Sequence, residues 1–118
     1  TQLLVLSNGL GNVEVMAKHV SSQQIIAGVT LWTSDLVQPG EIHVTGTGSI
    51  KLQAIDHEDI TAVVTALNEA VLNAEVSDNV VEAIWHKAGI NSFLNPLTVL
   101  LDAILLNLAQ QGMVWILH

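Results

Sequence analysis

The residues best suited to chemistry form a polar stripe within an otherwise apolar stretch. Lys87, Asn91 and Asn95 follow one another at four-residue intervals, so a helix would carry all three on one face. In a purely structural role, the lysine would extend to water and the asparagines would cap or bridge helices, because buried amides and ammonium groups need partners. The repeat ends at Pro96, and the chain has only one other lysine after Thr30, so the pattern favours a functional role.

Such a stripe suits proton transfer to a small polar substrate. A lysine partly removed from water beside Trp85 has a destabilised ammonium group, which lowers its pKa toward neutral pH. It would then donate a proton to a carbonyl oxygen while a hydride reached the carbonyl carbon. The two amide groups would hold hydroxyl and carboxylate oxygens of the substrate.

Two other patterns carry weaker signals. Residues 9–14 have the glycine spacing of a dinucleotide-binding loop, but Glu14 stands where a glycine or alanine is needed and would repel a pyrophosphate. We therefore interpret this segment as a turn after a strand. None of the five histidines forms an i, i+4 ligand pair, and Thr61 occupies the position where a zinc-peptidase helix beginning at His57 needs its second histidine. No metal site is predicted.

Composition narrows the class of protein. The 118 residues make at most one ordinary domain, and their 50% hydrophobic content excludes disorder. Three lysines against eleven carboxylates give a net charge of −8, which argues against nucleic acid and anionic membranes as partners. Polar residues interrupt the apolar stretch 97–117, so we expect a helix that is buried or covered by a partner chain, in a homo-oligomer, rather than a membrane span.

The elements that would position the stripe follow from hydrophobic patterning. Continuous apolar runs predict buried strands, alternation predicts a hairpin, and helical spacing predicts amphipathic helices. The expected elements are strands at 3–6 and 25–31, a helix at 12–20 capped by Asn12, a hairpin of 42–45 with 50–52 across the turn 46–48, and helices at 56–73 and 79–94. Asn95 and Pro96 are expected to start a further helix. This order predicts the late part of an α/β domain that continues into helices only.

Several motifs in this order resemble those of the ketopantoate reductase (2-dehydropantoate 2-reductase) family. The most specific is the block Trp-x-Lys-x-x-x-Asn-x-x-x-Asn-Pro-Leu-Thr at 85–98, and the resemblance covers roughly residues 3–101. It also includes the segments 8–11, 28–30 and 39–48. Members of this family reduce ketopantoate to pantoate with NADPH, on the route to pantothenate and coenzyme A. They join a Rossmann domain to a helical domain, with the active site in the cleft between them.

The resemblance implies a role for each matching residue. Lys87 corresponds to the family's general acid, and Asn91 and Asn95 to its substrate-binding asparagines. Asn8 corresponds to an asparagine that contacts both cofactor and substrate, and Ser34 falls where the family makes a backbone-type cofactor contact. We therefore expect an NADP-dependent, cytoplasmic oxidoreductase acting on a small 2-oxo acid.

The resemblance also implies a division of the chain. Residues 1–75 would be the C-terminal part of a Rossmann-type cofactor domain, and residues 76–118 the start of a helical domain for substrate binding and dimerisation. The family's phosphate loop lies upstream of the segment matched here, and Leu105 stands where the family has a further asparagine. We therefore expect a partial chain that is inactive alone. Another β-hydroxyacid dehydrogenase, or a non-catalytic remnant that self-associates through its apolar tail, are the alternatives.

Overall fold

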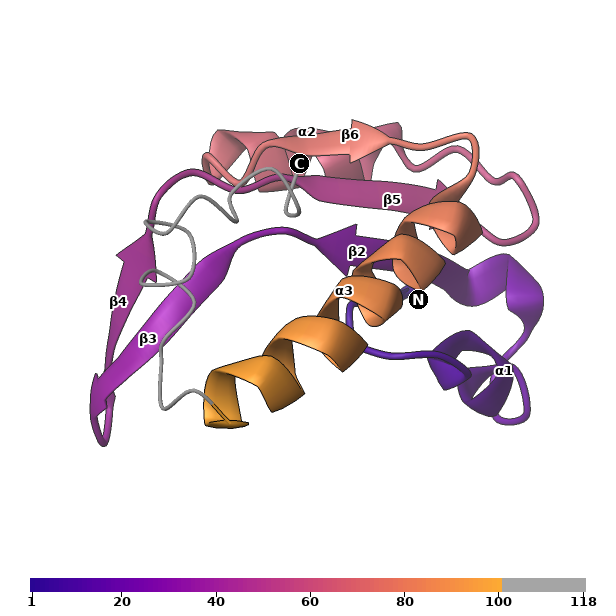
Figure 1. The fold of residues 1–118 in the computed structure, drawn as a ribbon. Helices are drawn as coiled ribbons and strands as arrows, with labels where there is room; N and C mark the ends of the chain where they lie inside the picture. Colours follow the sequence, from indigo (N-terminus) through magenta and orange to yellow (C-terminus); the bar gives the residue numbers. More distant parts are fainter. Residues whose placement is uncertain (101–118) are drawn as a thin grey trace.

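A computed structural model describes residues 1–100 of the chain as a mixed α/β fold (Figure 1). Its strands are β1 (Leu3–Val5), β2 (Ile25–Thr30), β3 (Thr33–Gln38), β4 (Glu41–Thr45), β5 (Ile50–Ala54) and β6 (Ala74–Val76). Its helices are α1 (Asn12–Met16), α2 (Thr61–Glu69) and α3 (Val80–Leu100), with a short 3-10 turn at Ser22–Gln24. The expected strands at 3–6 and 25–31 are confirmed by β1 and β2.

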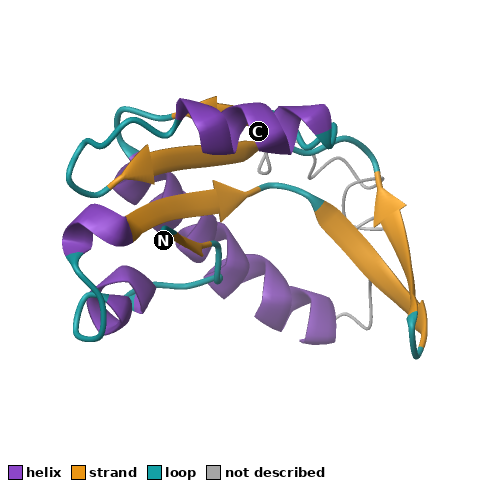
Figure 2. Ribbon diagram, turned by 180° about the vertical axis from the view of Figure 1, so that it is seen from behind, coloured by secondary structure: helices purple, strands orange, loops and turns teal. Residues whose placement is uncertain are grey.

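Four strands form one sheet in the order β1-β2-β5-β6. β1 runs parallel to β2, β5 runs antiparallel to β2, and β6 runs parallel to β5. The carboxyl ends of β1 and β2 therefore lie at the same edge of the sheet, where the segments after Val5 and Thr30 emerge. Strands β3 and β4 form a separate two-stranded sheet among residues 1–100 and extend away from the larger sheet as a ribbon (Figures 1 and 2).

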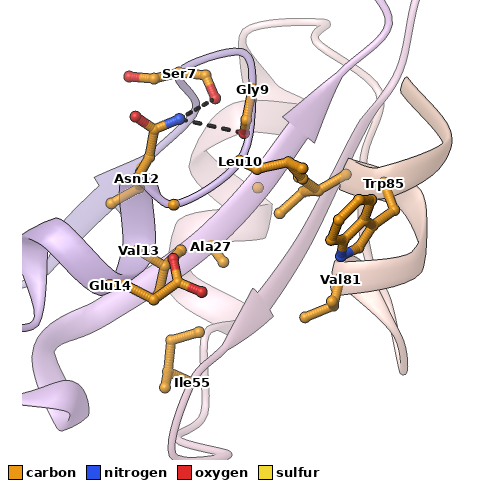
Figure 3. Close-up of a pocket in the computed structure, with 14 residues that line it drawn as sticks. Ser7, Gly9, Leu10, Asn12, Val13, Glu14, Ala27, Ile55, Val81 and Trp85 are labelled. Carbon is orange, nitrogen blue, oxygen red and sulfur yellow. Dashed lines mark hydrogen bonds between the residues drawn. The ribbon is translucent and has the colours of Figure 1, made fainter. Parts of the chain in front are cut away.

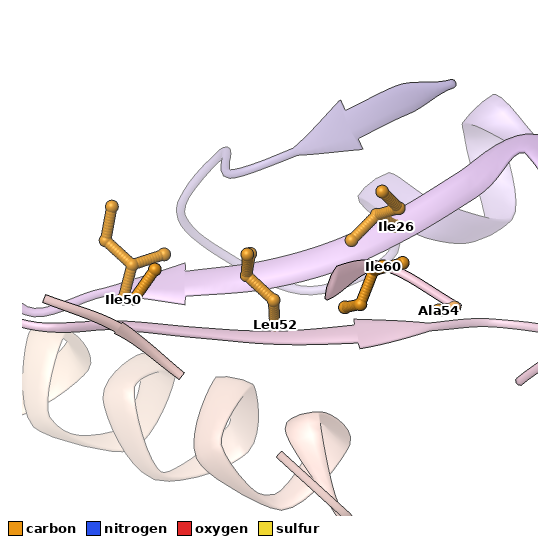
Figure 4. Packing of buried hydrophobic residues seen from close by; sticks show 6 residues of the cluster. Ile26, Ile50, Leu52, Ala54 and Ile60 are labelled. Atoms are coloured by element: carbon orange, nitrogen blue, oxygen red, sulfur yellow. The ribbon is translucent and has the colours of Figure 1, made fainter. Parts of the chain in front are cut away.

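Alternation along β2 separates the two faces of the sheet. Ile26 points to one face and joins Leu52, Ile60 and their neighbours in a core covered by α2 (Figure 4). Ala27 and Val29 point to the other face and pack with Val80 of α3. The sheet is thus a central layer with α2 on one side and α1 and α3 on the other, as the two views show (Figures 1 and 2). Such layering buries an apolar face on each side.

The centre of the sheet depends on the absence of a side chain at Gly28. A Cβ atom there would lie 2.6 Å from Leu52 Cδ2 and 2.6 Å from Leu6 Cδ2, closer than carbon atoms can pack. Leu52 is fully buried, so it has little freedom to move aside. The glycine lets these two leucines close over β2.

The predicted hairpin across Gly46–Gly48 is wrong. β4 pairs with β3 through the Pro39-Gly40 turn, with Leu36 opposite Ile42, whereas β5 pairs with β2. Alternation identified residues 42–45 and 50–52 as strands but carried no information about their partners. The segment 46–49 instead returns the chain from the ribbon to the sheet.

The helix expected at 56–73 is shorter at both ends. His57 has a left-handed backbone (φ 58), and α2 begins at Thr61, whose backbone N–H donates to Asp59 Oδ1 at 2.9 Å. At the other end Val71 is left-handed (φ 60) and its N–H donates to Asn68 O, while Leu72 N donates to Leu67 O. This pair of bonds is a Schellman motif, which stops the helix. Strand β6 follows, where only helices were expected.

The predicted interruption at Asn95-Pro96 is also wrong, because α3 continues through Pro96 to Leu100. A proline inside a helix removes one backbone donor, which the turns on both sides tolerate here. The first helix, α1, is shorter than the expected 12–20, and Asn12 does not cap it. The Asn12 amide instead donates to the carbonyl oxygens of Ser7, Asn8 and Gly9. The expected helix after Pro96 lies mostly outside the described residues.

Candidate active site

Lys87 lies where α3 crosses the carboxyl end of β2. Its ammonium Nζ donates a hydrogen bond to the backbone carbonyl oxygen of Thr30, the last residue of β2. The side chain is half-buried, and this burial lowers the pKa of Lys87 below its ordinary value. Loss of hydration disfavours the charged form, so the ammonium releases its proton more readily than an exposed lysine does. The group therefore has the properties expected of a proton donor.

Asn8 shares a narrow cavity with Lys87. The cavity has a volume of about 10 Å³ and is lined by Leu6, Ser7, Asn8, Gly9, Gly28, Val29, Ile84 and Lys87. A volume of ~10–15 Å³ holds about one water molecule. The loop after β1 and the lysine of α3 thus meet at one edge of the sheet, although 79 positions separate the two residues in the sequence.

Lys87 also lines a wider cavity of about 680 Å³. Polar and charged side chains line much of it: Lys51, Ser77, Asp78, Asn79, Glu82, His86 and Lys87. Val29, Leu31, Ala83 and Ile90 supply its apolar wall. This space is large enough for a small organic substrate, since ligand pockets commonly measure ~300–1,000 Å³. Lys87 therefore borders both a water-sized gap and an open cavity.

The remaining predicted site residues lie outside both cavities. Asn91 and Asn95 continue the stripe along the unbroken helix α3, with Asn91 half-buried and Asn95 exposed. Ser34 is exposed on β3, opposite Val44 of the ribbon. The structure thus brings Asn8 and Lys87 together, aligns the two asparagines with the lysine on one helix, and leaves Ser34 on a separate element.

The glycine turn at 9–14 borders a different pocket (Figure 3). Leu10, which lies beside Trp85 of α3, lines this pocket, and Glu14 lies in the first turn of α1. Its volume is about 140 Å³ and its lining is mostly apolar. A helix of five residues that begins next to a carboxylate offers little to a phosphate, as the sequence indicated.

Residues 1–100 contain neither a cluster of metal-ligating side chains nor a helix suited to span a membrane. Within residues 1–100, no three histidine, aspartate or glutamate side chains lie close enough together to hold a metal ion. Over the same residues, no helix is both long and apolar enough to cross a membrane.

The residue that sequence reasoning missed is Thr30. Its contribution is a backbone carbonyl oxygen, which every residue possesses, so residue type gave no signal. The position of Thr30 at the carboxyl end of a strand did carry a signal, because polar groups at such ends are the usual ligand contacts of α/β sheets. Asp78 and Glu82, which line the wider cavity, are also not among the residues predicted for the site.

Comparison with known proteins shows which family the chain resembles. Residues 1–57 match the sequence model described as ketopantoate reductase PanE/ApbA. The 2-dehydropantoate 2-reductase of Streptococcus pyogenes serotype M3 is 42% identical over 105 residues, which cover 86% of this chain and 34% of that protein. The enzyme of the same name from Lactococcus lactis is 39% identical over 115 residues, 95% of this chain and 36% of its own length. The chain spans about a third of the length of these curated relatives.

Solved structures agree with this result. A ternary structure of D-mandelate dehydrogenase with NADH and anilino(oxo)acetate superposes with a TM-score of 0.79 at 35% identity, over 86% of this chain and 34% of that one. The 2-dehydropantoate 2-reductase of Geobacter metallireducens gives a TM-score of 0.77 at 34% identity, over 86% and 35%. These similarities confirm the predicted Rossmann-type α/β fold.

Proposed function

We propose that the chain belongs to the ketopantoate reductase family and supplies the proton-donating part of an enzyme that reduces ketopantoate to pantoate with NADPH. The observation that carries the proposal is the half-buried ammonium of Lys87, held at the carboxyl end of β2 beside Asn8. This is the edge at which open α/β sheets bind their ligands. We place the reaction in pantothenate and coenzyme A biosynthesis, in the cytoplasm.

Lys87 would act as the general acid. Reduction of a ketone places negative charge on its oxygen, and a nearby ammonium group stabilises that charge and then donates the proton. Burial of the lysine favours this transfer because it lowers the pKa of the donor. Asn91 and Asn95, on the same helix face, would hold the hydroxyl and carboxylate oxygens of the substrate through their amides.

NADPH, when bound, supplies the hydride for the keto carbon. The described residues fit only the reacting end of this cofactor. Asn8 lies next to Lys87 and can contact both cofactor and substrate, and Ser34 would make a lesser contact. The turn at 9–14 gives the pyrophosphate no cradle, because α1 has five residues and carries Glu14 in its first turn. We therefore propose that the 118 residues alone do not turn over, and that the rest of the reductase fold must hold the dinucleotide.

A second candidate is reduction of another 2-oxo acid with NADH. It is favoured by the similarity to D-mandelate dehydrogenase, whose structure holds NADH and anilino(oxo)acetate. The chemistry at Lys87 would be the same, since both reactions protonate a carbonyl oxygen. The two candidates differ in the substrate side chain and in the 2′-phosphate of the cofactor.

Chimeric enzymes can separate the candidates. Residues 1–100 would replace the matching segment of the Streptococcus pyogenes reductase, and NADPH and NADH oxidation would be followed with ketopantoate or with the 2-oxo acid of mandelate. We expect ketopantoate with NADPH to give the higher kcat/KM. A preference for the mandelate-derived acid would favour the second candidate, and no turnover with either acid in a folded chimera that binds cofactor would contradict both.

Self-association remains a prediction. It rests on the apolar sequence after Leu100, which lies outside the described residues. Sedimentation at several protein concentrations tests it, and a monomer whose mass does not depend on concentration would contradict it.

A further inference from the structure

Three loops meet behind the carbonyl group that accepts the Lys87 hydrogen bond. The chain leaves β2 through Thr30, Leu31 and Trp32, and Leu31 N donates to Ser49 O at 2.8 Å. Trp32 N donates to the Thr30 hydroxyl at 3.2 Å, and the indole Nε1 donates to Leu72 O at 2.8 Å. The turn between β2 and β3 is thus fixed by the segment before β5 and by the loop after α2.

Gly48 makes this junction possible. A Cβ atom at position 48 would lie 2.5 Å from Trp32 Cα and 2.6 Å from both Trp32 N and Trp32 Cγ. Two of these three atoms belong to the backbone, so a side-chain rotation could not relieve the overlap. The carbonyl of Gly48 is also held, because Asn73 Nδ2 donates to it at 3.0 Å. A side chain at position 48 would therefore displace the Trp32 backbone.

We propose that Gly48 and Trp32 are positioning residues for Lys87, because they fix the turn that aims the Thr30 carbonyl at the lysine ammonium. Displacement of the Trp32 backbone breaks its bond to the Thr30 hydroxyl and rotates the last peptide of β2. Lys87 then loses its acceptor and extends into the wider cavity. The link to proton donation rests on the proposed function, but the hydrogen bond itself does not.

The charged groups near Lys87 lie on segments other than the turn that Gly48 and Trp32 fix. The wider cavity places Lys51 of β5, Asp78 before α3, and Glu82 and His86 of α3 beside it. Lys51 also pairs with Glu75 of β6 at 3.7 Å. None of these groups lies on the 30–32 or 46–49 segments, so a change at Gly48 alters the acceptor of Lys87 without altering the charged groups that line the cavity.

The test is NMR of the full chain labelled with ¹³C and ¹⁵N at lysine. The sequence contains only Lys18, Lys51 and Lys87, and lysine-to-arginine variants assign their signals. In Gly48→Ala we expect loss of the slowly exchanging ammonium signal of Lys87 and an upward shift of its titration midpoint, because the released side chain becomes hydrated. The exposed Lys18 serves as an internal reference. Gly89→Ala is the matched control, since a Cβ there meets no atom within 4 Å.

A second pair of variants covers the case in which Gly48→Ala does not fold. Thr30→Val keeps the branched shape of the strand residue but removes the acceptor of Trp32 N, whereas Thr30→Ser keeps the hydroxyl. We expect Thr30→Val to show the same loss of the Lys87 ammonium signal and the same shift of its titration midpoint as Gly48→Ala. We expect Thr30→Ser to retain the wild-type signal. An unchanged exchange rate and midpoint for Lys87 in folded Gly48→Ala or Thr30→Val would overturn the proposal. Because this readout needs no turnover, an inactive chimera would count against the proposed function and not against this inference.

Discussion

The Lys87 ammonium and the Thr30 backbone carbonyl are joined by a hydrogen bond across 57 positions of sequence. The bond ties helix α3 to the carboxyl end of β2, where Asn8 also lies. A hydrogen bond from a charged donor favours the charged form, whereas burial opposes it. For Lys87 the effect of burial is the larger, so its pKa is lowered. The lysine is thus held by a hydrogen bond while its pKa lies below the ordinary value.

The first prediction concerns pH. Only protonated Lys87 can act as an acid, so kcat of the chimera should fall as pH rises through a value below that of an ordinary lysine. Ala83→Asp would place a carboxylate one turn away and should move this fall to higher pH, because an opposite charge favours the ammonium. A kcat profile that does not move with Ala83→Asp would contradict the assignment.

The same pKa shift predicts how stability changes with pH. The folded-state pKa of Lys87 is lowered, so between that value and the ordinary one the unfolded chain binds more protons. The contribution of Lys87 to the free energy of unfolding should therefore increase as the pH rises between these two pKa values. Urea denaturation of wild type and Lys87→Met at several pH values measures the difference between their free energies of unfolding. This difference should be smallest at the upper end of that pH range.

A second prediction concerns the end of α2. Val71 holds the left-handed position of a Schellman motif, which costs a β-branched residue roughly 1–2 kcal/mol. Its side chain is 73% exposed, so little packing would be lost on removal. Val71→Gly should raise the free energy of unfolding by about 0.5–1 kcal/mol after the entropic cost of glycine. Ala66→Gly, inside the same helix, should lower it by a similar amount, and equal losses in both variants would exclude strain at Val71.

A third prediction concerns the sheet. Gly28→Ala would press a methyl group against Leu52 and Leu6 and should destabilise the fold by about 1–3 kcal/mol. Gly89→Ala adds the same methyl group in open space on a helix and should stabilise by about 0.5–1 kcal/mol. Thermal denaturation of both variants tests the contrast. A Gly28→Ala variant as stable as wild type would mean that the two leucines can move apart.

A fourth prediction concerns acid stability. The Thr61 hydroxyl donates to Asp59 Oδ1 at 2.6 Å and, with the Thr61 backbone N–H, lowers the pKa of Asp59 below 3.8. Stability from this carboxylate is complete above the unfolded-state value and is lost as pH falls through the lower folded-state value. Asp59→Asn should therefore weaken the decline in melting temperature in acid. Thr61→Val, which removes the hydroxyl donor alone, should weaken it partially; a parallel decline in all three proteins would contradict this role.

Much of the fold could be predicted from hydrophobic patterning. The apolar run of β2 is almost entirely buried and that of β1 is partly buried, and the continuity of each run identified it as a strand. Strand pairing could not be predicted, because the alternation in β4 and β5 is the same whether they pair with each other or with β3 and β2. β6 has three residues, too few for a period to show.

The ends of the helices could not be predicted from the sequence, for a different reason. His57, Val71 and Asn73 adopt left-handed backbones without being glycine, so no glycine in the sequence marks these positions. The candidate site divides in the same way. Lys87 and Asn8 could be found from residue type and motif, whereas the Thr30 carbonyl could not, because a backbone acceptor is defined only by the fold.

The most direct test of the account is the effect of Lys87→Ala on ketopantoate-dependent oxidation of NADPH by the Streptococcus chimera. Removal of a general acid should lower kcat by about 10²–10⁴-fold with little change in NADPH binding. Lys18→Ala, an exposed lysine outside both cavities, should leave kcat unchanged. A Lys87→Ala chimera that turns over at the rate of its parent would contradict the assignment of Lys87 as the proton donor.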